Sequence, residues 1–203
     1  MKKYPAIALI EYSSIATGIL AGDEMLKKAP IAVIKSGTVH NGKYLILIGG
    51  SVASVEESYA KGIEIDPDNI IDSMILPNVH EQLHDSILGS RLKCTKESLG
   101  IIEASSVSTM IKASDAGVKG ADVNIIEIRL ADDIGGKSFT IYNGSIEEIQ
   151  AAVEIAKNAV NVQEHWVNET IIPYLHDDMK IQIDQTTSFA QVKLVMVRDS
   201  EVL

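Results

Sequence analysis

The sequence repeats itself, and this repeat constrains the fold more than any single motif does. The stretch 8–15, ALIEYSSI, returns 92 residues later as 100–107, GIIEASSV. The same spacing continues through matched pairs: Asp23 and Asp115, Lys27 and Lys119, Ala29 and Ala121, Ile34 and Ile126. The chain is therefore a tandem duplication of a unit of roughly 90 residues. We expect a first domain over 1–92, a linker over 93–98, a second domain over 99–180 and a C-terminal extension over 181–203.

Each unit predicts the element order β-α-β-β-α-β. The opening strands are expected at 6–11 and 99–103, and the helices after them begin at Ser13 or Ser14 and at Ser105 or Ser106 as N-caps. The remaining predicted elements are strand pairs at 31–39 with 43–49 and 123–130 with 137–142, helices at 52–62 and 146–159, and short strands ending at Pro77 and Pro173. The predicted fold class is α+β, with two ferredoxin-like (split βαβ) domains whose mostly antiparallel sheets carry helices on one face. A β-like stretch at 190–197 has no partner that we identify.

The composition excludes several classes of protein. With 46% hydrophobic and 23% charged residues, the chain is expected to be soluble and globular. A net charge of −10 and only 4% aromatic residues disfavour nucleic-acid binding. The apolar N-terminal stretch is interrupted at Glu11, so we expect neither a signal peptide nor a membrane span. Cys94 is the one cysteine and cannot form an internal disulfide, which favours the cytoplasm.

Several spaced motifs, each present twice and in the same order, resemble the shell proteins of bacterial microcompartments. They are the opening IEYSSIATGILAGDEMLKKAP with its echo IEASSVSTMIKASDAGVKGAD, the segment GKYLILIGGSVASVEESYAKG, and the closing LPNVH and IPYLH. The resemblance covers nearly all of residues 4–180 and is greatest to the tandem-domain trimers of propanediol-utilisation compartments. It implies a homotrimeric, pseudohexagonal tile with a central pore for small metabolites, located in a microcompartment shell in the cytoplasm and meeting other shell proteins edge to edge.

The resemblance also implies roles for particular residues. The loops between the second and third strands of each unit would line the pore: Val39, His40, Asn41 and Gly42 in the first unit, and Asp132, Asp133, Ile134 and Gly135 in the second. The adjacent acidic residues are interpreted equally well as an acidic collar or as a solvated loop. Residues matching the family's tile edge are Lys27, Lys119, His80 and His176. Each lysine is also spaced for an i,i+4 pair with Asp23 or Asp115.

No catalytic residue and no cofactor is required for this function. An alternative is a trimer that relays electrons across the shell through a metal ion or iron–sulfur cluster on its threefold axis. In the propanediol-utilisation branch the first-unit loop carries a cysteine that helps hold such a cluster, and this sequence has His40 there. Three copies of His40 would converge on the axis, as three histidines do at zinc sites. Iron–sulfur clusters are held chiefly by thiolates, which disfavours a cluster.

Two further motifs imitate catalytic sites. His80-Glu81-Gln82-Leu83-His84 fits the H-E-x-x-H pattern of zinc proteases, but it follows Pro77 closely, lacks an obvious third ligand and is not kept in the repeat. The segment 134–138, IGGKS, ends like a phosphate-binding loop, yet it leads from a hairpin into a strand rather than into a helix. We therefore predict a structural protein rather than a hydrolase or a nucleotide-binding protein.

Overall fold

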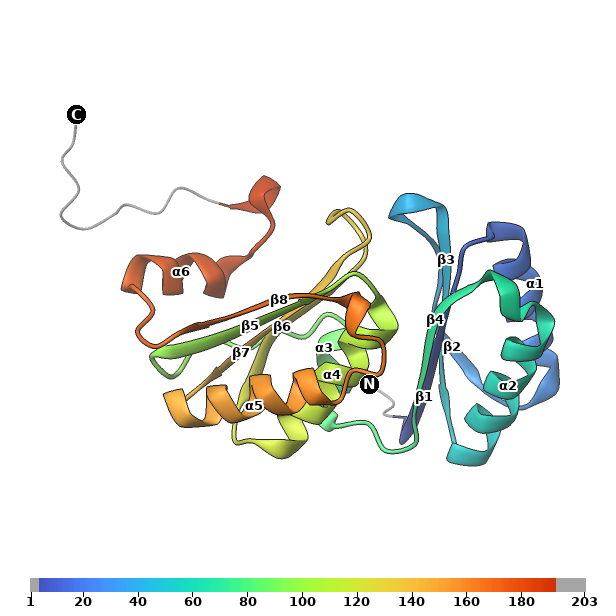
Figure 1. Ribbon diagram of the computed structural model, residues 1–203, viewed down its shortest axis with the longest axis horizontal. Coiled ribbons are helices and arrows are strands. Elements are labelled where there is room, and N and C mark those ends of the chain that lie inside the picture. Colours follow the sequence, from blue (N-terminus) through green and yellow to red (C-terminus); the bar gives the residue numbers. More distant parts are fainter. Residues whose placement is uncertain (1–3, 193–203) are drawn as a thin grey trace.

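The protein folds into two similar units, each built on a four-stranded antiparallel sheet (Figure 1). The computed structural model describes residues 4–192. Sheet A of the first unit has the strand order β2-β3-β1-β4, and sheet B of the second unit has the matching order β6-β7-β5-β8. All six strand pairings are antiparallel. This confirms the predicted α+β class and the split βαβ arrangement.

The elements follow the predicted order in both units. The first unit contains β1 (Ala6–Tyr12), α1 (Ile15–Lys28), β2 (Ala32–Val39), η1 (His40–Gly42), β3 (Lys43–Gly50), α2 (Val52–Ile65), η2 (Pro67–Asn69) and β4 (Ile70–Leu76). Helix α3 (Glu81–Ile87) then leads to the second unit, which contains β5 (Ser98–Ala104), α4 (Val107–Gly120), β6 (Asn124–Leu130), β7 (Ser138–Gly144), α5 (Ile146–Asn158), η3 (Gln163–His165) and β8 (Trp166–Ile172). After β8 come α6 (Asp177–Gln185) and η4 (Phe189–Gln191).

Serine side chains set the start of the four long helices. The hydroxyls of Ser14, Ser51, Ser106 and Ser145 each accept a hydrogen bond from the backbone N–H three residues further on. This satisfies one of the N–H groups that a helix leaves unpaired at its start. The structure thus selects Ser14 and Ser106 between the two serines predicted in each unit.

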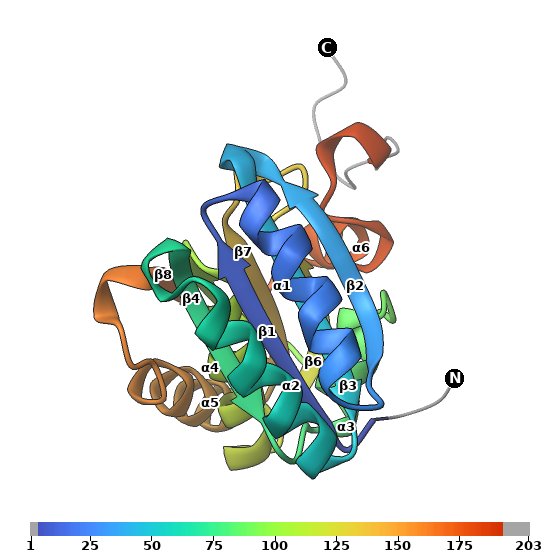
Figure 2. The ribbon, with the colours of Figure 1, turned by 90° about the vertical axis from the view of Figure 1, so that its right-hand side faces the viewer.

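The central strand β1 is buried on both faces, which explains its apolar sequence apart from Glu11. Ala6, Ala8, Ile10 and Tyr12 belong to a cluster with residues of α1 and α2. These two helices cover one face of sheet A and face the viewer in Figure 2. The other face of β1 packs against a different part of the chain.

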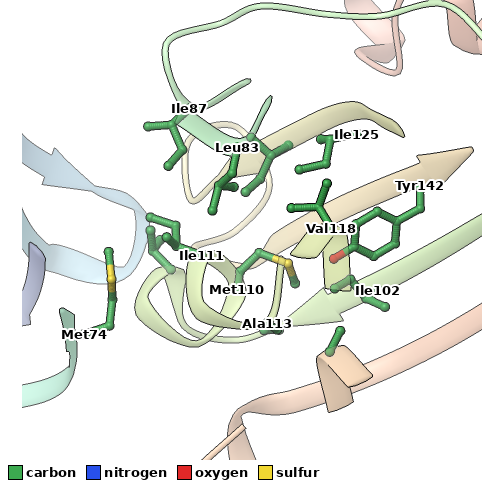
Figure 3. Packing of buried hydrophobic residues seen from close by; sticks show 14 of the residues in the cluster. Met74, Leu83, Ile87, Ile102, Met110, Ile111, Ala113, Val118, Ile125 and Tyr142 are labelled. Atoms are coloured by element: carbon green, nitrogen blue, oxygen red, sulfur yellow. The ribbon is translucent and has the colours of Figure 1, made fainter. Parts of the chain in front are cut away.

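That other face of sheet A packs against the second unit, and we call this contact the junction. One hydrophobic cluster joins Leu9, Leu47 and Met74 of sheet A to Leu83 of α3 and Ile111 of α4. Figure 3 shows Met74 on the side of the first unit and Ile111 and Met110 on α4. Helix α4 is consequently sandwiched between its own sheet B and sheet A.

Helix α6 follows β8 as α3 follows β4, and it lies on the face of sheet B opposite to α4 and α5 (Figure 1). Its residue Ile183 packs in a small cluster with Cys94 and Ile126. The Arg91 guanidinium donates to the Ile183 carbonyl at 2.6 Å, and the Cys94 N–H donates to Asp184 Oδ1 at 2.8 Å. Residues 190 and 191 of the predicted strand 190–197 belong to the 3₁₀ helix η4, so the strand prediction is wrong for them. Residues 193–197 lie outside the described range. No helix within residues 4–192 is long and apolar enough to cross a membrane.

Candidate functional site

The two hairpin loops that were predicted to line a pore lie side by side at one end of the molecule (Figure 1). The Asp133 N–H donates to His40 Nδ1 at 3.3 Å, and Asn41 Nδ2 donates to the Gly135 carbonyl at 3.0 Å. Positive φ angles at Asn41 and Gly135, of 68° and 65°, allow these tight turns. The chain therefore presents the first-unit and second-unit loops as one clasped pair.

Most of the predicted pore residues are open to solvent in the single chain. Val39 and Ile134 are partly buried, whereas the others are exposed: His40, Asn41, Gly42, Asp132, Asp133 and Gly135. The acidic pair and the histidine thus come from different units, and Asp133 contacts His40 at this end of the molecule.

The hydrogen bond of His40 has the opposite polarity to the one that usually supports a metal ligand. Metal-ligating histidines generally donate a proton from their second ring nitrogen to an oxygen acceptor. Here Nδ1 accepts from the Asp133 N–H, so a neutral His40 ring carries its proton on Nε2. Among residues 4–192 of a single chain, no three His, Cys, Asp or Glu side chains are grouped to hold a metal ion.

Cys94 lies away from these loops, buried beneath α6. Burial raises the pKa of the Cys94 thiol to about 12, and its hydrogen bond with Asp184 acts in the same direction. The thiolate, which is the metal-binding form, is therefore disfavoured at this position.

The H-E-x-x-H motif does not form a zinc site. His80 is the N-cap of α3 rather than a residue within it, and its Nδ1 accepts from the Gln82 N–H at 3.3 Å. His84 is 3% exposed, and its Nε2 accepts from the Tyr4 N–H at 3.3 Å. The two rings are occupied by structural hydrogen bonds. The IGGKS segment likewise lies in the β6–β7 turn, as predicted, where no helix begins.

The junction contains a buried polar cluster to which the sequence analysis assigned no role. The carboxylate of Glu11 is fully buried, and its Oε1 accepts from the Ser106 hydroxyl and from the Ser108 N–H, both at 2.7 Å. Asp72 accepts from the Thr109 hydroxyl at 2.8 Å, and its Oδ2 also lies within hydrogen-bond distance of Ser106 Oγ, whose single proton serves both carboxylates. Two carboxylates of sheet A thus hold the first turn of α4. The signal in the sequence was a glutamate at the same place in both apolar opening strands.

A second polar group holds the junction at the other end of α4. Asp115, 4% exposed, accepts from the His80 N–H at 2.8 Å. Lys119 pairs with Asp115 and donates to the Asn78 carbonyl. Of the predicted tile-edge residues, Lys119 and His80 are therefore brought together.

The other two predicted edge residues, Lys27 in the first unit and His176 after the second, are both exposed. Lys27 pairs with Asp23 and Glu24 on α1, and its side chain is 62% exposed. His176, the N-cap of α6, is 73% exposed.

The fold and this duplicated arrangement agree with comparisons to known proteins. The chain matches the BMC domain family twice, over residues 6–79 and 98–175. The protein belongs to the BMC domain family and carries two of these domains in tandem.

Two relatives are a microcompartment shell protein and a carboxysome assembly protein. The bacterial microcompartment shell protein PduT of Citrobacter freundii is 34% identical over 174 residues, covering 86% of this chain and 95% of PduT. The carboxysome assembly protein CcmO of Synechocystis is 23% identical over 191 residues, covering 86% of this chain and 63% of CcmO.

Solved structures give the same result for the fold. A microcompartment protein from Desulfitobacterium hafniense is 36% identical, with a TM-score of 0.76 over 87% of this chain and 98% of its own. A fused, permuted hexameric shell protein of the RMM microcompartment has a TM-score of 0.54 at 22% identity, over 77% of this chain and 82% of its own.

Proposed function

We propose that this protein is a structural shell protein of a bacterial microcompartment, and that three copies close into a pseudohexagonal tile around a central pore for small metabolites. The observation that carries the proposal is that each chain contains one complete junction between a helix and a sheet. It also carries a second helix surface and a second sheet surface that are equivalent to the two sides of this junction but do not contact each other, and we call these two surfaces the unpaired halves. The relatives named as shell proteins support the same function.

The first unpaired half is the outward surface of α1. Its large apolar residues Ile15, Ile19, Leu20 and Leu26 are 41%, 54%, 52% and 50% exposed. In the repeat, Ile15 and Ile19 correspond to Val107 and Ile111 of α4, which are 1% and 0% exposed because sheet A covers them. A row of large apolar side chains on one helix is characteristic of an interaction surface.

The second half is the part of the face of sheet B opposite to α4 that α6 leaves open. It presents the partly buried Ile101 and Phe139 beside the exposed Asn168 and Thr170. Sheet A uses the corresponding face to cover α4, so sheet B is the surface expected to cover α1 of another copy. A contact between two different surfaces of identical chains forms a closed ring when the rotation between copies closes. Two units in each of three chains then give six wedges.

In such a ring the clasped loop pairs face the axis. Three His40–Asn41 loops would alternate with three Asp132–Asp133 loops, and rings of charged side chains select among permeating solutes. A rim that carries three or more carboxylates at neutral pH favours neutral or cationic solutes over anions. We assign no catalytic residue and require no cofactor for this function.

The outer edge of the tile is proposed to meet other shell proteins in the cytoplasm. Lys27, Lys119, His80 and His176 are the proposed edge residues. The ammonium of a lysine has three N–H donors. Lys119 uses donors for Asp115 and the Asn78 carbonyl, which leaves one for a neighbouring tile.

The mass of the protein in solution tests the proposal. Sedimentation equilibrium should give three times the chain mass of 22.0 kDa, and electron microscopy at higher concentration should show sheets with hexagonal order. A monomer at micromolar concentration would contradict the ring. A stable trimer that never forms sheets, alone or with other shell proteins, would contradict the tile.

A further inference from the structure

The start of α4 at the junction shows how this chain stabilises a helix end with a carboxylate from another unit. Neither α1 nor α4 has an acidic residue in its first turn. For α4 the negative charge comes from Glu11, whose carboxylate accepts from the Ser106 hydroxyl and the Ser108 N–H. A carboxylate at this position satisfies N–H groups that the helix leaves unpaired and is favoured by the helix dipole.

Lys43 completes this arrangement. Its ammonium lies 3.6 Å from Glu11 Oε2 and donates to the Ser105 carbonyl at 3.3 Å. The Lys43 side chain is only 15% exposed, and its positive charge lies beside the buried negative charge of Glu11. Buried carboxylates are tolerated when they are paired and hydrogen-bonded in this way.

The second unit has the same two residues without a helix to bind. Glu103 corresponds to Glu11, and its side chain is 37% exposed. Lys137 corresponds to Lys43 and lies 3.8 Å from Glu103 Oε2, with 56% exposure. Glu103 and Lys137 therefore lie ready on the face of sheet B that the proposed ring uses.

The start of α1 offers the matching hydrogen-bonding groups. Ser14 corresponds to Ser106, and its hydroxyl oxygen already accepts from the Thr17 N–H at 3.3 Å. The hydroxyl proton of Ser14 and the N–H of Ala16 correspond to the two groups that Glu11 binds on α4. Ser14 is partly buried and Ala16 is exposed in the single chain.

We infer that Glu103 of one copy caps helix α1 of the next copy, accepting from the Ser14 hydroxyl and the Ala16 N–H, while Lys137 pairs with Glu103 and donates to the Ser13 carbonyl. The inference rests on the proposed ring, since the partner is a second copy of this chain. It gives the contact between copies a buried ion pair and a helix cap in addition to its apolar surface.

One difference between the junction and this contact increases the weight on Glu103. The strand register places Asp72 opposite Glu11 but Asn168 opposite Glu103. The junction therefore supplies two carboxylates to α4, and the contact between copies supplies one to α1. Loss of Glu103 would therefore leave no carboxylate from these two paired strand positions of sheet B, and only Asp66 of the same chain, which accepts from the Thr17 hydroxyl, would remain near the first turn of α1.

The trimer dissociation curve of the full chain tests this inference. Glu103→Ala should raise the concentration at which half of the trimer dissociates by roughly 10- to 100-fold, as expected for losing charge-assisted hydrogen bonds. Lys137→Met should weaken the trimer less. Glu154→Ala, which removes an exposed glutamate of α5, is the matched control and should behave as wild type.

A mutant cycle identifies the partner. Ser14→Ala alone should also weaken the trimer. Glu103→Ala should weaken the trimer less in the Ser14→Ala background than in wild type, because both changes remove the same hydrogen bond. Circular dichroism should show native helix content in each variant. The proposed cap is wrong if the wild type is a trimer and the Glu103→Ala trimer is as stable as the Glu154→Ala trimer. It is also wrong if the effects of Glu103→Ala and Ser14→Ala are additive. Either result would leave the proposed ring standing. A monomeric wild type would overturn the ring itself.

Discussion

Helices α1 and α4 have related sequences and equivalent positions in their units, yet their surroundings differ. The buried residues of α1 are Gly18, Ala21 and Met25, which face its own sheet. Helix α4 buries residues on almost every side, because sheet A covers the side that α1 leaves open. The comparison teaches that one chain contains a complete example of the contact it is proposed to make with its neighbours.

The largest expected effect separates the two helices directly. Ile111→Asp places a carboxylate between two sheets, where Ile111 is 0% exposed, and should destabilise the chain by more than about 4 kcal/mol. Ile19→Asp is the equivalent change on α1, where Ile19 is 54% exposed. It should leave the monomer folded and abolish the trimer.

Urea unfolding and sedimentation together check this pair of variants. The comparison fails if Ile19→Asp still forms trimers, since α1 would then lie outside the contact between copies. It fails as well if the urea midpoint of Ile111→Asp is not lower than that of Ile19→Asp.

A second difference lies beneath the two helices. A Cβ atom at Gly18 would lie 2.5 Å from Tyr44 Cδ1 and 2.7 Å from Tyr44 Cβ. In the first unit the small Gly18 on the helix lies against the large Tyr44 on the strand. In the second unit the sizes are reversed, with Met110 on the helix and Ser138 on the strand. Gly18→Ala should therefore destabilise the chain by about 1–3 kcal/mol through overpacking.

The Tyr44→Ser background tests this explanation. Removing the ring should make Gly18→Ala cheaper by at least about 1 kcal/mol in a mutant cycle measured by urea unfolding. Gly22→Ala is the control, since a Cβ there would meet Ile46 Cδ1 at an ordinary 3.6 Å. It should be neutral or stabilising by up to about 1 kcal/mol. Equal costs for both glycine variants would show that helix propensity, not Tyr44, controls this site.

The far ends of the two helices give a third and smaller contrast. Asp115→Ala removes the acceptor of the His80 N–H and should destabilise the chain by about 1–2 kcal/mol. Asp23 has the corresponding position on α1 and is exposed. Asp23→Ala should leave chain stability unchanged and weaken the trimer by a few-fold, because in the ring it would face the 173–176 loop of another copy.

Thermal unfolding of the diluted chain and trimer dissociation measure the two effects separately. If Asp23→Ala alters only the formation of sheets, then this end of α1 belongs to the tile edge alone and not to the contact between copies.

The sequence was sufficient for the fold because the repeat supplied each prediction twice. Hydrophobic spacing and the serine caps located the four long helices, and the structure moves most of the predicted element ends by one to three residues. The shorter helices α3 and α6 were not predicted. The partner of sheet A was not predictable in this way. The apolar run at 6–11 predicted a strand, but its pattern does not identify what covers each face of that strand.

The polar residues of the junction were missed for a related reason. Glu11 interrupts an apolar strand and was interpreted only as an obstacle to a membrane span. Its role depends on Ser106 and Ser108, nearly a hundred residues away in the chain, and local pattern does not encode that proximity. The adjacency of the His40 and Asp133 loops, by contrast, followed from family resemblance.

The last and smallest effect concerns α6, whose counterpart α3 is wedged into the junction. Cys94 lies beneath α6, and burial together with Asp184 raises the pKa of its thiol to about 12 from an ordinary value of 9.0. In the unfolded chain this thiol loses its proton above about pH 9, whereas in the folded chain it keeps the proton. The contribution of the Cys94 thiol to the stability of the folded chain is therefore fully present below pH 9 and is lost as the pH rises toward 12. The free energy of unfolding should fall in this range.

Cys94→Ala should flatten this dependence between pH 9 and 10, below the range in which buried tyrosines such as Tyr12, with a pKa raised to about 12, begin to contribute. Asp184→Asn removes one cause of the raised pKa and should speed alkylation of Cys94 by iodoacetamide at pH 8, because the thiolate is the reactive form. Urea midpoints across this pH range and alkylation rates measure both effects. If Cys94 of the wild-type chain is alkylated as fast as a free thiol, then α6 does not cover it in solution. In that case α6 would differ from α3, which stays packed in the junction, by more than the structure shows.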